Sequence, residues 1–251
     1  MRDEAETSGV PVLLMLLLAT VVGMSGLNTD LFLVMQQFSA LLPDALWANL
    51  TILGDALVSL VLLSLLAFRY PSLLPVGLLA GLVATLFTRS LKPLLAVERP
   101  LMVLGDQVHV IGTDLFTVSL PSGHTTAAFV VAGVYALVLQ RDRLTAAFFT
   151  LALLAGFSRI GVGAHWPMDV FAGAAIGWFS AWAGWKVAQH WQWQHSLNGQ
   201  RTFALLFLGL ALLLFWLDTG YPQAIRLQQL IASLAIVASV IRLWQISRNR
   251  R

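Results

Sequence analysis

The chain has 251 residues, of which 58% are hydrophobic and only 11% are charged, and its formal net charge is +3. Soluble domains usually contain about 25% charged residues, so this composition excludes an ordinary soluble domain and predicts a polytopic membrane protein. The absence of cysteine excludes a disulfide framework and cysteine-ligated zinc or iron–sulfur sites. The basic residues are spread between apolar runs, which fits membrane topology better than binding of nucleic acid.

Apolar stretches near the roughly 20 residues that cross a bilayer predict an all-α, polytopic transmembrane helical bundle. Eight spans are expected, at about 9–26, 47–68, 72–91, 123–140, 144–162, 168–188, 203–218 and 225–244. The acidic start and the lack of a small-residue cleavage site after the first span favour a retained helix over a cleaved signal peptide. Residues 29–44 are amphipathic, which predicts a helix lying at the membrane interface.

The distribution of the 15 Lys and Arg residues predicts the orientation of the spans. With the N-terminus in the cytoplasm, ten of them lie at cytoplasmic ends and five on the opposite side. An even number of spans then places both termini in the cytoplasm. The five outer residues are Arg89, Lys92, Arg99, Arg159 and Arg226. Three of them belong to the polar patches described next, so these patches are predicted to lie at the outer face.

Lys92, Arg99 and Arg159 fall at one membrane depth in this topology. A single cation at the end of a span commonly anchors the helix at the interface. Three cations at one level, on the side where they are disfavoured, point instead to a bound anion. Guanidinium groups bind phosphate oxygens through paired hydrogen bonds and lysine adds a point charge, so the set indicates a phosphate.

The sequence Pro121-Ser122-Gly123-His124 directly precedes an apolar span. Ser122 suits a helix N-cap, which is the structural explanation. The same geometry favours an anion, because N–H groups point out of a helix N-terminus, Gly123 permits close approach and the serine hydroxyl adds a donor. His124 would then project from the first turn toward that anion. The two interpretations are compatible.

His165 and Asp169 flank the start of a further span, with Pro167 suited to its first turn. The carboxylate of Asp169 can reach one ring nitrogen of His165, fix the tautomer and make the other nitrogen more nucleophilic. Such a pair could also bind a metal, but no third ligand of that kind is evident in the sequence, so neither a metal nor another cofactor is expected.

Other polar residues have both structural and functional explanations. For Asp55, inside the second span, a structural partner is favoured over catalysis, either an arginine of the site or a helix-capping bond. The outer segment 97–121, which includes Asp114, is either a lid or a plain connection. The last two spans contain no chemical constellation, and Asp218 and Arg226 only flank the turn between them.

The polar patches form an ordered pattern: Lys92, six residues, Arg99-Pro100; then Pro121-Ser122-Gly123-His124; then Ser158-Arg159, five residues, His165, three residues, Asp169. This pattern resembles the signature of the type-2 phosphatidic acid phosphatase superfamily. That family includes bacterial undecaprenyl-pyrophosphate and phosphatidylglycerophosphate phosphatases and shares its fold with vanadium haloperoxidases. The resemblance implies a six-helix phosphatase core over residues 1–190, followed over 191–251 by a polar link, two additional spans and a basic tail.

The resemblance also implies a metal-independent lipid phosphatase with assigned roles. His165 is expected to attack phosphorus and form a phosphohistidine, Asp169 to orient it, and His124 to protonate the leaving oxygen and later activate water. The residues expected to bind the phosphate are Lys92, Arg99, Ser122, Gly123 and Arg159.

The expected partners are the lipid bilayer, here a bacterial inner membrane, and a lipid phosphate or pyrophosphate reached from the periplasm or cell exterior. Undecaprenyl pyrophosphate is the preferred substrate, because an outer-face site suits recycling of a lipid carrier. Phosphatidylglycerophosphate, phosphatidate and diacylglycerol pyrophosphate stay open, as does transfer to an acceptor lipid. A flippase would need polar residues on the cytoplasmic side of the spans, and an inactive scaffold would not need both histidines. The sequence predicts no oligomeric state.

Overall fold

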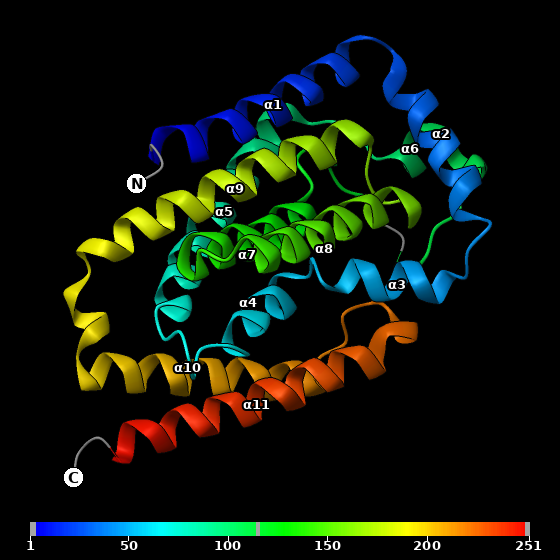
Figure 1. Cartoon of the computed structure of the whole chain (residues 1–251). Coiled ribbons are helices and arrows are strands. Elements are labelled where there is room, and N and C mark those ends of the chain that lie inside the picture. The colour runs from blue at the N-terminus through cyan, green and yellow to red at the C-terminus, as the bar shows by residue number, and fades with distance from the viewer. Residues whose placement is uncertain (1–3, 114–115, 249–251) are drawn as a thin grey trace.

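Every regular element is a helix in residues 4–113 and 116–248, the part of the chain that the computed structural model describes (Figure 1). The chain begins with α1 (Glu4–Met24), α2 (Leu27–Ser39), α3 (Asp44–Ile52), α4 (Ala56–Ser64), α5 (Leu73–Leu95), α6 (Pro100–Leu104) and the 3-10 turn η1 (Gly105–Gln107). It continues with α7 (Gly123–Leu139), α8 (Asp142–Gly161), α9 (Pro167–His190), η2 (Gln192–His195), α10 (Leu197–Trp216), η3 (Pro222–Ala224) and α11 (Ile225–Arg248). The all-α prediction is confirmed.

Helix α7 occupies the middle of the bundle and contacts α4, α5, α8 and α9 (Figure 1). A buried apolar cluster joins these helices and includes Leu63, Val76, Ala80, Val134 and Ala181. Helix α1 packs along α9, whereas α10 and α11 pack against each other and against α4. Alanines at the helix contacts allow the backbones to approach closely, as is usual for helices packed in membranes.

Four segments of the described chain are long and apolar enough to cross a membrane, at 73–107, 142–161, 197–216 and 222–248. Two bent helix pairs, α1 with α2 and α3 with α4, raise this number to six if each pair is one span. Helix α7 is a shorter apolar helix of 17 residues. The chain is a multi-pass membrane protein, as predicted, and the number of eight spans stays a prediction.

The second expected span, 47–68, is two helices rather than one. Helices α3 and α4 are bent by 64° at the break between them. Asp55 starts the second helix, because its carboxylate accepts hydrogen bonds from the backbone N–H groups of Leu57 at 2.9 Å and Val58 at 3.1 Å. The helix-capping bond, one of the two structural alternatives for Asp55, is therefore confirmed.

The break also brings the chain against the first turn of α7. A Cβ atom at Gly54 would lie 2.5 Å from the carbonyl oxygen of His124, so a side chain at this position would displace the start of α7.

Helix α2, which covers most of the amphipathic segment 29–44, runs across one end of the bundle at 97° to α1 (Figure 1). Its buried Gln36 donates hydrogen bonds to the carbonyl oxygens of Ile160 at 2.7 Å and Gly161 at 3.2 Å, at the end of α8. The same side chain accepts one from the backbone N–H of His109 at 3.0 Å. Helix α2 thus ties the end of α8 to the segment that follows α6, and its position at a membrane interface stays a prediction.

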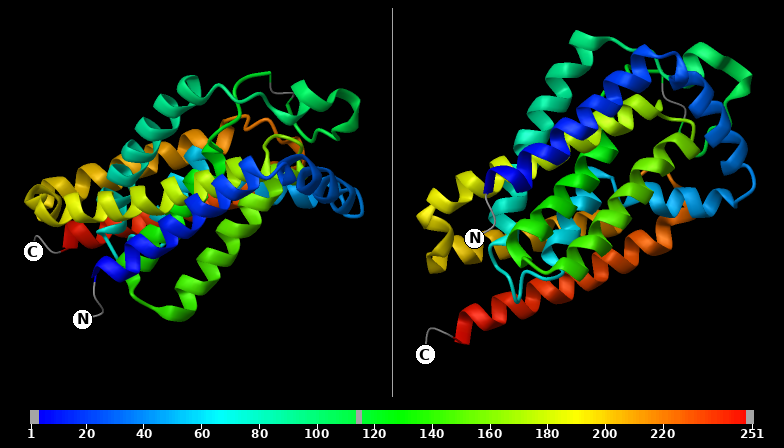
Figure 2. Two further views of the ribbon diagram at one scale, coloured as in Figure 1. Left: turned by 90° about the horizontal axis from the view of Figure 1, so that it is seen from above. Right: turned by 45° about the horizontal axis from the view of Figure 1, so that its top comes forward.

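The carboxyl ends of α5 and α8 meet the amino ends of α7 and α9 at this same end of the bundle. One connection is the hydrogen bond of 3.1 Å from the backbone N–H of Ser122 to the carbonyl oxygen of Asp169. The first turn of α1 and the last turn of α11 lie at the opposite end (Figures 1 and 2). Helix termini, with their unpaired N–H and C=O groups, therefore surround the region where the three polar patches lie.

Candidate active site

Lys92 and Arg99 both bind the backbone of the segment that leads into α7. Lys92, in the last turn of α5, donates from Nζ to the carbonyl oxygens of Val118 at 3.1 Å and Ser119 at 3.3 Å. Arg99, directly before α6, donates from Nε to the carbonyl oxygen of Thr117 at 3.1 Å. Residues 117–119, just before α7, are therefore bound by two of the three cations, and the choice between a lid and a plain connection for segment 97–121 stays open.

Arg159, in the last turn of α8, has only 1% of its surface exposed. Its Nη1 donates to the hydroxyl oxygens of Thr51 at 2.6 Å and Tyr221 at 2.7 Å. Its buried Nε has no hydrogen-bond partner within the described residues. That N–H is available to an acceptor such as a phosphate oxygen.

His165 lies in the connection between α8 and α9, beside the carboxylate of Asp169. The Nδ1 atom of its ring is 3.1 Å from Asp169 Oδ2, and both side chains are buried. The same carboxylate oxygen accepts hydrogen bonds from the hydroxyl of Ser119 and from the backbone N–H of Trp166, the latter at 2.9 Å. Ser119 Oγ is also 3.2 Å from Nδ1. Asp169 therefore caps α9 and holds the histidine ring with one oxygen atom.

The neighbours of His165 fix its tautomer. Nη1 of Arg99 is 3.3 Å from Nε2 of the ring and also donates to the carbonyl oxygen of Ala164 at 2.7 Å. Arginine has only donors, so Nε2 must be the acceptor and carry the lone pair. The proton then resides on Nδ1 and is directed at Asp169. This is the tautomer in which Nε2 is the nucleophilic nitrogen.

Ser122 is the N-cap of α7, as predicted. Its buried Oγ accepts hydrogen bonds from the backbone N–H of Thr125 at 3.4 Å and from the hydroxyl of the same residue at 2.9 Å. Gly123 and His124 form the first turn, and the His124 ring interacts electrostatically with all three cations of the site. A role of Ser122 and Gly123 in binding phosphate stays a prediction.

Burial and positive neighbours shift the acid–base behaviour of His165, which lies between α8 and α9. Burial, and then Arg99, hold the pKa of the His165 imidazole well below its ordinary value. A neutral imidazole near neutral pH is the form that can attack an electrophile.

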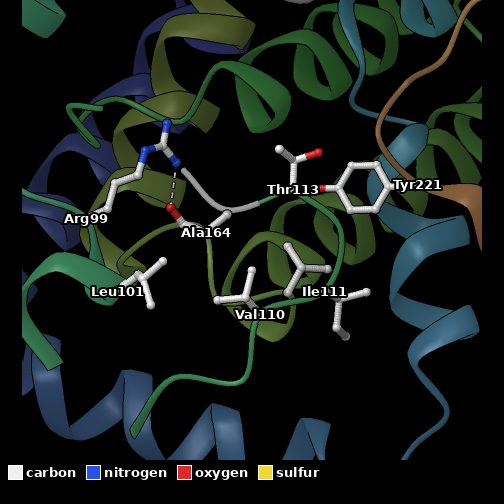
Figure 3. Close-up of a pocket in the computed structure, with 9 residues that line it drawn as sticks. Arg99, Leu101, Val110, Ile111, Thr113, Ala164 and Tyr221 are labelled. Atoms are coloured by element: carbon white, nitrogen blue, oxygen red, sulfur yellow. Dashed lines mark hydrogen bonds between the residues drawn. The ribbon is translucent and has the colours of Figure 1, made fainter. Parts of the chain in front are cut away.

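Two hollows adjoin these residues. A small pocket is lined by Arg99, Ala164, Thr113 and Tyr221, and Figure 3 shows Arg99 and the Tyr221 ring on opposite sides of it. A larger groove of about 370 Å³ lies between α4, α5 and α7 and is lined mainly by apolar side chains. His124 is among the residues that line it. The groove therefore joins an apolar surface to the polar site.

Sequence reasoning missed three residues of this arrangement: Ser119, Thr51 and Tyr221. Tyr221 lies in the turn between α10 and α11, for which no chemical role was predicted, and its hydroxyl contacts Arg159. Among the described residues, no group of three or more His, Asp or Glu side chains could hold a metal ion. Asp114, noted in the outer segment, lies outside the described residues.

Comparison with curated proteins gives two relatives named lipid A 1-phosphatase. The protein from Rhizobium etli is 36% identical over 123 residues, which are 45% of this chain and 47% of the relative. The protein from Rhizobium johnstonii is 46% identical over 63 residues, 25% of each. The chain thus matches about half, or less, of the length of these curated relatives.

Comparison with solved structures gives two similar proteins. LpxE from Aquifex aeolicus is 34% identical with a TM-score of 0.56, and the match covers 64% of this chain and 95% of that one. The PAP2-type phosphatidylglycerolphosphate phosphatase from Bacillus subtilis is 20% identical with a TM-score of 0.54. The match covers 72% of this chain and 95% of that one, and at this identity it shows likeness of fold alone. The model of the PAP2 superfamily matches residues 73–193. The chain belongs to the PAP2 superfamily.

Proposed function

We propose that this chain is an integral membrane lipid phosphatase that acts through a phosphohistidine at His165. The observation that carries the proposal is the environment of that ring. Its Nε2 bears a lone pair directed toward Arg99, and its Nδ1–H is held by buried Asp169. Lys92 and Arg159 converge on the same region from the ends of α5 and α8. A nucleophile surrounded by fixed cations suits attack on a phosphate, whose oxygens they stabilise as charge redistributes.

The proposed reaction has two steps. Nε2 of His165 attacks phosphorus, the bond from phosphorus to the lipid oxygen breaks, and that oxygen takes a proton from His124. The ring is then a phosphoimidazolium stabilised by Asp169. In the second step His124 removes a proton from water, the water oxygen bonds phosphorus, and the P–N bond returns its electrons to Nε2. Arg99 would exchange Nε2 for a phosphate oxygen when substrate binds.

The names of the relatives support a glycolipid phosphate as the substrate. Two are lipid A 1-phosphatases, so we propose a lipid of the lipid A class that bears a phosphate on its sugar. The apolar groove beside His124 offers a place for one acyl chain, with the headgroup at the cations. Undecaprenyl pyrophosphate, preferred from the sequence, stays the competing prediction. We further propose that the site faces the outer side, with both termini in the cytoplasm, because basic residues favour that orientation.

The test is phosphate release by the purified protein in detergent, from lipid A, undecaprenyl pyrophosphate, phosphatidylglycerophosphate and phosphatidate. We expect fastest release from lipid A, loss of all release in His165→Ala, and unchanged release with EDTA. His109→Ala is the matched control, since His109 is half exposed and paired with Asp44 outside the site.

Four outcomes would contradict parts of the proposal. Activity of His165→Ala equal to wild type would eliminate the phosphohistidine. Loss of wild-type activity on chelation would eliminate a metal-independent reaction. Release from undecaprenyl pyrophosphate but not from lipid A would reverse the choice of substrate. Phosphate recovered on a second lipid, instead of free in solution, would identify a transferase.

A further inference from the structure

The C-terminal helix pair reaches the phosphate-binding cations through one side chain. From this contact we propose that Tyr221, between α10 and α11, is a positioning residue for Arg159, so that the helix pair completes the phosphate site. This inference rests on the proposed function, because it assumes that Arg159 binds the phosphate of the substrate. Both hydroxyl partners of Arg159, Thr51 and Tyr221, lie outside residues 73–193, the part that matches the family. The family pattern therefore contains the arginine but not the groups that hold it here.

The chemistry of the two partners is suited to orienting a cation without neutralising it. Both accept from the same Nη1 atom, at 2.6 Å for Thr51 and 2.7 Å for Tyr221. A carboxylate in their place would pair with the guanidinium and compete with a phosphate for it. Neutral hydroxyl oxygens fix the direction of the planar group and leave available its charge and its Nε–H, which has no partner in the described part of the chain.

Tyr221 is itself held firmly against the loops of the site. Its ring is buried in an apolar cluster with Trp47, Ile111, Val162 and Ala164. Val162 and Ala164 lie three residues and one residue before His165. The ring also lies so close to Gly112 that a Cβ atom there would be 2.5 Å from Cε1 of the tyrosine.

The turn between α10 and α11 also contributes Ala224 to this cluster. This turn packs against α3, the helix that contains Thr51. Figure 1 shows the turn between α10 and α11 next to α3, and Figure 3 shows the tyrosine ring at the wall of the pocket that Arg99 also lines. The helix pair thus acts at two points on Arg159, directly through Tyr221 and through its packing on α3.

The experiment is Tyr221→Phe, which keeps the buried ring and removes only the hydroxyl oxygen. We expect kcat/KM for the lipid phosphate to fall about tenfold, because a buried guanidinium loses one of its two acceptors. The inhibition constant of inorganic phosphate should rise by a similar factor. In an Arg159→Gln background the same change should have no further effect, since the two residues act as one unit.

Tyr135→Phe is the matched control. Tyr135 is buried in α7, away from the site, and its hydroxyl donates to the carbonyl oxygen of Leu62 at 2.6 Å. This variant should lose stability without a change in phosphate inhibition. If Tyr221→Phe lowers Tm like the control but leaves kcat/KM and phosphate inhibition unchanged, the residue is only structural and the proposal is overturned. An equal loss in the Arg159→Gln background would overturn it as well, because the effect would not pass through Arg159.

A second measurement separates this inference from the proposed function. Inorganic phosphate should raise the Tm of the wild-type protein by binding the folded state, and the increase should be smaller in Tyr221→Phe but not in Tyr135→Phe. This comparison needs no turnover. If no lipid is hydrolysed but the Tm comparison holds, the proposed function fails and the role of Tyr221 stands; equal increases in the wild type and Tyr221→Phe refute that role.

Discussion

Replacing Asp169 by asparagine separates the charge of this residue from its shape. The carboxylate is buried, and its Oδ2 accepts hydrogen bonds from the Ser119 hydroxyl, the Trp166 N–H and His165 Nδ1. Asparagine has nearly the same size and can keep the bond to the Trp166 N–H. The variant should therefore fold. We expect kcat to fall, because in the proposed reaction the His165 ring becomes a cation when Nε2 bonds phosphorus, and the variant has no negative charge to stabilise it.

The geometry sets the size of this effect. The ring nitrogen lies 3.1 Å from the carboxylate oxygen, so the centres of the two charged groups are within a few ångströms. Two unit charges about 4 Å apart interact by about 4 kcal/mol at an effective dielectric constant of about 20. Since roughly 1.36 kcal/mol of barrier is a factor of ten in rate, we expect a fall of about a thousandfold. An amide N–H₂ turned toward Nδ1 would force the opposite tautomer and deepen the loss.

The assay is the initial rate of phosphate release at saturating lipid, with Tm measured on the same preparations. Asp44→Asn is the control, because Asp44 is half exposed and its pair with His109 is of the kind that contributes little to stability. A rate of Asp169→Asn within tenfold of the wild type, at an unchanged Tm, would refute the proposed stabilisation of a cationic ring. An equal loss of activity in Asp44→Asn would show that the assay does not isolate the buried carboxylate.

Two further substitutions test the supports of the site. Ser119→Ala should lower kcat by about tenfold to a hundredfold, because it removes a hydrogen bond to a buried carboxylate, and a rate equal to wild type would exclude the serine from positioning His165. Asp55→Ala should lower the free energy of unfolding by about 1 kcal/mol through loss of the α4 cap while kcat stays within about threefold, and a stable but inactive variant would contradict the capping role.

The features predicted best from the sequence depend on residues that are close along the chain. Ser122 bonds Thr125, three residues away, and the Asp169 carboxylate reaches His165 over four. Capping and first-turn geometry are local, so residue type and spacing are sufficient to predict them. Mean hydropathy likewise indicated an all-α membrane protein, because it depends only on the length and composition of each apolar run.

The features that sequence reasoning missed depend on distant partners or on small local changes. Thr51 and Tyr221 are 108 and 62 residues from Arg159 along the chain. The pattern of apolar and polar residues does not reveal which distant side chain a single hydroxyl group contacts. The break between α3 and α4 was missed because hydropathy does not distinguish one straight span from two bent helices. What marks the break is a single cap, at Asp55, and a close backbone contact at Gly54.

The three cations of the site share one property that explains how a positively charged cluster persists at the end of an apolar bundle. Within residues 4–113 and 116–248, none of them forms an ion pair with a carboxylate, and the acceptors that they bind are neutral. Lys92 and Arg99 bind backbone carbonyl oxygens, and Arg159 binds hydroxyl oxygens.

Hydrogen bonds from neutral oxygens offset part of the free-energy cost of burying a cation, but they leave its charge unneutralised. A doubly charged phosphate can therefore still form strong charge-assisted hydrogen bonds with these cations when it binds. The buried carboxylate of Asp169 lies instead beside Nδ1 of His165, where it would stabilise the ring cation of the proposed phosphohistidine. In the proposed reaction, neutral partners of the cations preserve their attraction for the substrate, and the negative partner acts where positive charge appears.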